Sequence, residues 1–102
     1  MSGNIQPRMV ALLTSQLDML GFQPSQSCKS QLEQMVFRGI TRMKIGGAID
    51  QPGRVLQAEK SLRDMVKYFS DYARDAGTYP TINESDFRAA LLASPPFWPY
   101  HS

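Results

Sequence analysis

The spacing of the apolar residues constrains the fold of this chain more than any other feature. In four segments the apolar side chains recur every three or four residues, which is the period of one helix face. The first of these stripes contains Val10, Leu13, Leu17 and Leu20. No segment shows sustained alternation with a period of two, as a half-buried strand would. The sequence therefore predicts an all-α fold without a sheet.

Local signals indicate where the first two helices begin and end. Pro7 suits the first turn of a helix, because its missing N–H has no partner to lose there. Gly21 follows the first stripe at the position of a left-handed cap, and Phe22 can fold back on the helix behind it. The second helix can be capped by either Ser25 or Ser27.

Similar signals delimit the later helices. Residues 46–53 contain three glycines and a proline, and they predict a loop. Asn83 is a suitable N-cap, with Asp86 in the first turn after it and with Ile82 and Phe87 placed as a hydrophobic staple. We expect helices at about residues 7–20, 26–45, 54–76 and 84–93, packed as a compact bundle and followed by an extended aromatic and proline-rich tail at 95–102.

The length of the chain fits one domain. Its 102 residues can bury one modest core but leave little room for a second. Hydrophobic residues make up 42% and charged residues 20%, as in globular rather than disordered proteins. We expect residues 1–102 to form a single helical domain. On its third helix, Glu59–Arg63 and Lys67–Asp71 have the spacing of surface ion pairs.

The inventory of reactive residues is small. Cys28 is the only cysteine and His101 the only histidine, so an intramolecular disulfide is excluded and the usual zinc ligand sets cannot be assembled. We expect Cys28 to be a buried core residue. His101 lies next to the end of the sequence, where chains are usually mobile, which argues against a Cys28–His101 catalytic pair. The sequence predicts a protein that is not an enzyme and has no metal, cofactor or small-molecule substrate.

The sequence also indicates in which part of the cell the protein acts. Its start lacks the charged region and apolar run of a signal peptide. No apolar run approaches the roughly 18 residues that span a bilayer. We expect an intracellular protein that does not act in a membrane; the pattern does not distinguish cytoplasm from nucleus.

Basic residues gather in one part of the chain, although the formal net charge is only +2. Arg38, Arg42, Lys44 and Arg54 fall in a stretch with Asp50 as its only acid. One interpretation is a patch that contacts the phosphates of a nucleic acid. The other is a solvated helix end, where cations are favourable in any case. A nucleic-acid-binding module is therefore our alternative prediction of function.

The tail is the most unusual segment. Phe97, Trp98 and Tyr100 lie among three prolines, which hold a chain extended. The tail can strap back over the helices, or it can anchor a partner through its aromatic side chains. Met35 and Met43, in the second stripe, are suited to adaptable contacts. Our leading prediction is an interaction subunit or adaptor that buries a helical face in a homo- or hetero-oligomer.

Two parts of the sequence resemble a known family. Residues 9–43 contain a short helix that ends in Leu-Gly-Phe and a polar connection into a longer helix. Residues 69–77 and 81–91, which include a Thr-Ile pair and Asp86, look like the end of a central helix, a loop and a last helix. Together these motifs resemble the histone fold of TATA-binding-protein-associated factors. The resemblance implies heterodimerisation through helical faces within a transcription or chromatin assembly.

The chain departs from that family at two places. The glycine-rich residues 46–53 interrupt what would be one unbroken central helix in a histone fold. Tyr79 and Pro80 precede the Thr-Ile pair, where the family often carries a basic residue able to clamp the aspartate. In this chain the expected role of Asp86 is therefore limited to the N-terminus of the last helix.

Overall fold

A computed structural model describes residues 5–43 and 52–95, without the side chains of residues 5, 43, 52 and 54. These residues form four helices and no strand. The helices are α1 (Ile5–Leu20), α2 (Gln26–Met43), α3 (Pro52–Ala76) and α4 (Glu84–Ala93). The predicted all-α bundle is confirmed, whereas the predicted tail from residue 96 onward lies outside the described residues.

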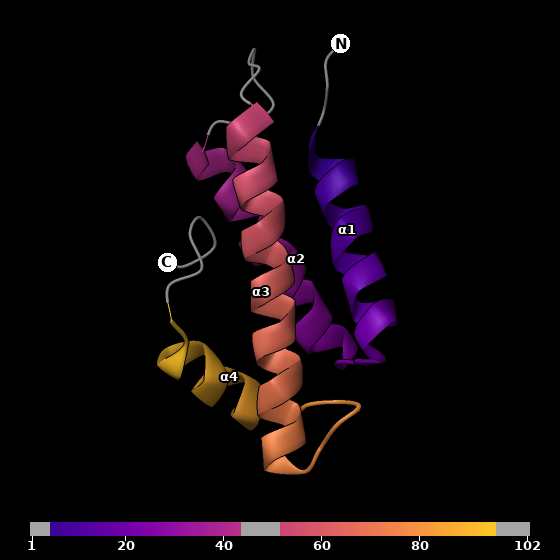
Figure 1. The fold of residues 1–102 in the computed structure, drawn as a ribbon. Helices are drawn as coiled ribbons and strands as arrows, with labels where there is room; N and C mark the ends of the chain where they lie inside the picture. Colours follow the sequence, from indigo (N-terminus) through magenta and orange to yellow (C-terminus); the bar gives the residue numbers. More distant parts are fainter. Residues whose placement is uncertain (1–4, 44–51, 96–102) are drawn as a thin grey trace.

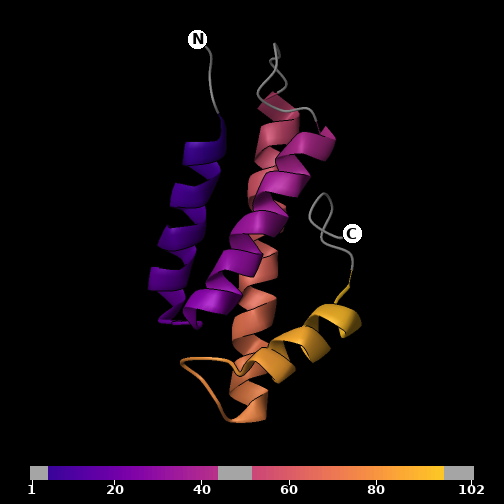
Figure 2. The same cartoon turned by 180° about the vertical axis from the view of Figure 1, so that it is seen from behind.

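The helices form an elongated bundle of 43 × 23 × 20 Å (Figure 1). α1 and α3 run in the same direction and pack against each other, while α2 runs the opposite way. Seen from behind, α2 lies in front of α3 and crosses it at an angle (Figure 2). The short α4 packs at the C-terminal end of α3 and also contacts α2.

Two predicted helix boundaries shift by two residues. α1 begins at Ile5 rather than Pro7, and Pro7 still lies in the first turn, where no N–H has an intrahelical partner. α3 begins at Pro52 rather than residue 54, with proline at the first helical position. α2 is described as far as Met43, so its predicted last two residues lie outside the description.

The apolar stripes of all four helices meet in one core. Cys28 is fully buried there, as predicted. Phe69 of α3 stacks on Phe87 of α4, with 4.7 Å between ring centroids. The other large, fully buried side chains are Met9, Leu13, Phe22, Leu32, Val36, Leu62, Met65, Val66 and Ile82.

The end of α1 has the predicted left-handed cap. Gly21 has a φ of +64°, and its N–H donates to the carbonyl of Asp18 at 3.1 Å. The N–H of Phe22 donates to the carbonyl of Leu17 at 3.0 Å, which completes a Schellman motif. Of the two serines that could cap α2, Ser25 does so: its hydroxyl accepts from the N–H of Cys28 at 3.3 Å.

The loop after α3 packs at the end of the molecule where α1 ends and α2 begins. The Tyr79 hydroxyl donates to the carbonyl of Leu20, and the N–H of Gln23 donates to the carbonyl of Pro80 at 2.6 Å. The guanidinium of Arg74 lies 3.7 Å from the centroid of the Tyr79 ring. The two hydrogen bonds tie the loop to the end of α1 and the α1–α2 connection, which lie more than fifty residues earlier in the chain.

α4 begins after Asn83, as predicted, with Ile82 and Phe87 buried on either side. The Asn83 side chain makes no cap hydrogen bond and instead donates to the Asp86 carboxylate at 3.5 Å. Tyr68 holds α4 onto α3 by donating its hydroxyl to the carbonyl of Ala90 at 2.7 Å. Burial, with a smaller contribution from neighbouring Tyr72, raises the pKa of Tyr68 above its ordinary value.

The surface ion pairs match the prediction in part. Lys67 and Asp71 form the predicted pair at 2.7 Å. The predicted Glu59–Arg63 pair is wrong, because Glu59 instead pairs with Arg8 of α1 at 2.8 Å. Glu59 is mostly buried along the seam between α1 and α3, so a tertiary partner replaces the local one.

Candidate interaction surfaces

The structure places only some of the predicted contact residues. Met35 is only 5% exposed and packs in the core, so its predicted role as a partner contact is corrected to a structural one. It lies on the stripe of α2 that faces the other helices. Six other predicted contacts have no described side chain, or lie outside the described residues altogether: Met43, Lys44, Arg54, Phe97, Trp98 and Tyr100.

An aromatic residue lies beside two arginines on the outer face of α2. Phe37, Arg38, Thr41 and Arg42, which we call the α2 patch, line a shallow hollow of about 280 Å³. The Phe37 side chain is 38% exposed, and both predicted arginines beside it are exposed. Arg38 forms no ion pair with any carboxylate among the described residues. The α2 patch therefore presents apolar area and positive charge together.

Phe37 was not among the contacts predicted from the sequence, although the helical period places it off the buried stripe of α2. The buried stripe of α2 includes Met35, Val36 and Ile40. One step along a helix turns about 100°, so Phe37 follows Val36 but points away from that stripe. A large aromatic residue off the core stripe and next to an arginine was the available signal.

A second hollow lies where α3 ends and α4 begins. Tyr72, Asp75, Ala76 and Asp86, which we call the acidic corner, line about 240 Å³. Asp75 is exposed, and the Asp86 carboxylate accepts from Asn83. The acidic corner thus combines two carboxylates with the partly buried ring of Tyr72.

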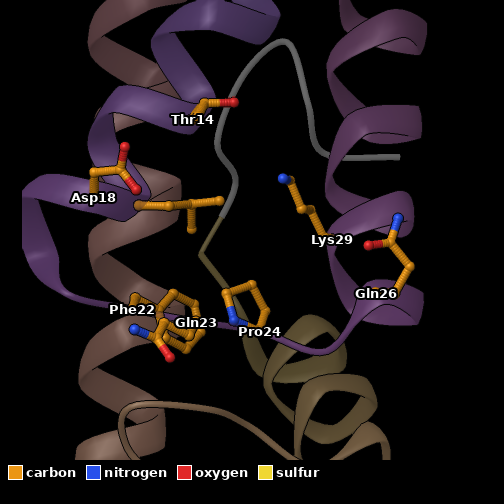
Figure 3. A pocket seen from close by; sticks show the side chains of 8 residues that line it. Thr14, Asp18, Phe22, Gln23, Pro24, Gln26 and Lys29 are labelled. Carbon is orange, nitrogen blue, oxygen red and sulfur yellow. The ribbon is translucent and has the colours of Figure 1, made fainter.

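A third hollow, of about 270 Å³, lies between α1 and the start of α2 (Figure 3). Asp18 of α1 and Lys29 of α2 stand on opposite walls, with Thr14 above them in this view. Its polar lining side chains are exposed or only partly buried. The hollow is therefore a solvent-exposed polar gap between two helices rather than a desolvated site for chemistry.

Other exposed apolar residues are scattered. Leu92 of α4 is 83% exposed, Met19 lies near the end of α1 and Leu56 near the start of α3. None of the three lines any of the hollows described above. Single exposed apolar residues are common on protein surfaces, so these positions serve as comparison sites rather than candidate sites.

Three further findings concern metal binding, membrane-spanning helices and similarity to known proteins. Within residues 5–43 and 52–95, no group of three or more His, Cys, Asp and Glu side chains is arranged to hold a metal ion. No helix in this part of the chain is both long and apolar enough to cross a membrane. Comparison with known proteins finds no matching family model, curated protein or solved structure.

Proposed function

We propose that this chain is a non-enzymatic, intracellular interaction subunit that docks a protein partner on the α2 patch. The observation that carries the proposal is the exposure of Phe37 beside Arg38 and Arg42 on one hollowed face. Aromatic residues and arginine are enriched in protein interfaces, where an apolar centre is surrounded by polar groups. A partner with a carboxylate next to an apolar side chain would complement both features.

The resemblance to histone-fold subunits supports a setting for this activity. In that family, subunits pair through helical faces, and the α2 patch is such a face. We therefore propose a transcription or chromatin-type assembly as the context. The tail residues Phe97, Trp98 and Tyr100 remain proposed anchors for the same assembly.

The proposal is tested by substituting Phe37 with aspartate and measuring affinity for a purified partner. The partner is first identified by co-purification with the tagged chain and then reconstituted from separate preparations. We expect F37D to weaken binding at least tenfold, because a charge replaces the apolar contact. L92D is the matched control, since it places the same charge at a more exposed position outside the patch, and it should change affinity less than twofold. Equal losses for the two variants would contradict the proposal.

The alternative function, nucleic-acid binding, is favoured by one feature of the same patch. Phe37 lies beside two arginines, and an aromatic ring that stacks on a base next to phosphate-binding cations is a common arrangement. Fluorescence anisotropy with a labelled single-stranded oligonucleotide tests it. Binding that falls steeply with salt and is lost in both F37A and R38E would support this alternative. No binding at about 50 mM salt would exclude it.

A further inference from the structure

The α2 patch and the acidic corner carry opposite charge. Residues 34–43 contain two arginines and no acid, whereas residues 71–86 contain four acids and one arginine. That one arginine, Arg74, is placed over the Tyr79 ring. Helix dipoles favour cations near the end of α2 and Asp86 near the start of α4, but they disfavour Asp75 in the last turn of α3. They also do not account for the apolar hollow beside each set of charges.

The two surfaces also match in their make-up. Arg38 and Arg42 are one helical turn apart, with Phe37 beside them. In the acidic corner, Asp75 and Asp86 border a hollow with Tyr72 and Ala76. Two cations and a phenyl ring thus have counterparts in two carboxylates and an apolar wall.

One molecule cannot join its own two surfaces. The acidic corner lies at the C-terminal end of α3, a helix of 25 residues that extends over about 37 Å. The C-terminal half of α2 lies toward the other end of the bundle, near the start of α3, in both views (Figures 1 and 2). Contact between the two surfaces therefore needs a second molecule.

We propose that the acidic corner of a second copy of this chain docks on the α2 patch. This inference rests on the proposed function and names its occupant. Phe37 of one copy packs on Tyr72 and Ala76 of the other, while Arg38 and Arg42 face Asp75 and Asp86. Arg38, Arg42 and Asp75 are exposed, so the contact weakens as salt screens these charges.

Sedimentation velocity of the purified full chain at about 50 mM salt tests this contact. Wild type should associate as its concentration is raised through the micromolar range, and less so at about 500 mM salt. R38E and D75R should each weaken association by about tenfold or more. An equimolar mixture of the two variants should recover it, because the unaltered α2 patch of D75R then meets the unaltered acidic corner of R38E. R63E and D18R are matched controls: they alter exposed charges outside both surfaces, and they should behave as wild type.

Several results would overturn the proposal. They are a wild-type monomer at high micromolar concentration, R38E indistinguishable from R63E, or no recovery in the mixture. Circular dichroism of each variant confirms that its fold is intact. If wild type is monomeric but F37D still loses affinity for a different protein, self-docking is wrong while the proposed function stands.

Discussion

Tyr79, in the loop after α3, and Phe37, in the C-terminal half of α2, are both aromatic residues, but only Tyr79 is held by contacts within the chain. The Tyr79 hydroxyl donates to Leu20, and its ring lies under Arg74, so the residue is occupied by contacts within the chain. Phe37 is more than one-third exposed beside two exposed arginines. The end of the molecule built around Tyr79 closes the fold, whereas the α2 patch remains available for a partner.

The largest expected difference between the two kinds of region is in stability. Phe69→Ala removes a fully buried ring that stacks on Phe87, and it should lower the free energy of unfolding by about 3–5 kcal/mol. Phe37→Ala should lower it by no more than about 1 kcal/mol, because much of its ring is already in water. Urea unfolding of both variants measures the contrast. Similar losses would show that Phe37 is a structural residue.

Two glycines test how much the contacts around Tyr79 contribute to stability. Gly21 and Gly77 both have positive φ, so alanine at either position should cost about 1–2 kcal/mol of stability. At Gly21 a Cβ would also lie 2.8 Å from the Tyr79 hydroxyl oxygen, whereas at Gly77 it would meet no atom within 4 Å. We expect Gly21→Ala to be more destabilising by about 1 kcal/mol, since the Tyr79 hydrogen bond must shift. Equal melting temperatures for the two variants would contradict the inference that the hydrogen bond from Tyr79 to Leu20 stabilises this end of the molecule.

Tyr68 gives a smaller test with a pH signature. Tyr68→Phe removes the hydrogen bond to Ala90 and should cost about 1 kcal/mol at neutral pH. Because burial and Tyr72 raise the pKa of Tyr68 in the folded chain, the unfolded chain loses this proton first. The stability that depends on protonated Tyr68 is therefore full below about pH 10 and declines above it. Urea titrations of wild type and Y68F should converge above that pH, and a difference that grows there would contradict the assignment.

The smallest expected effect is a gain. Ser70 lies in α3, and its buried hydroxyl has no hydrogen-bond partner among the described residues. Ser70→Ala removes this unsatisfied group and favours the helix, so it should raise the free energy of unfolding by up to about 1 kcal/mol. Urea unfolding measures the change, and a loss of about 1 kcal/mol would indicate that the hydroxyl has a partner in solution.

How much the sequence predicts depends on the range of each interaction. The cap at Gly21 and the start of α4 after Asn83 depend on neighbours within a few residues, and both predictions are confirmed. Of the two serines predicted as possible caps of α2, Ser25 makes the hydrogen bond. The Arg8–Glu59 pair joins residues 51 positions apart, so local spacing predicted a different partner for Glu59.

The candidate site was predicted less completely than the fold. Arg38 and Arg42 were predicted, from their charge, as possible contacts for nucleic acid, and both line the α2 patch. Met35 was chosen for its residue type, but its position on the helix decides that it is buried. Phe37 was missed because residue type does not report which way a side chain points. The hydroxyl bond from Tyr79 to Leu20 depends on how two distant connections meet, which no local pattern encodes.

The central claim is that the outer face of α2 contacts another protein molecule, whereas the scattered exposed apolar residues do not. The most direct measurement places the photo-crosslinking residue p-benzoyl-phenylalanine at position 37, or at position 92 as the control, in the full chain inside cells. Position 92 is the more exposed of the two, so random collisions favour it. We predict one discrete protein adduct from position 37, identified by mass spectrometry, and none from position 92. No protein adduct from position 37, or the same set of adducts from both positions, would contradict the account.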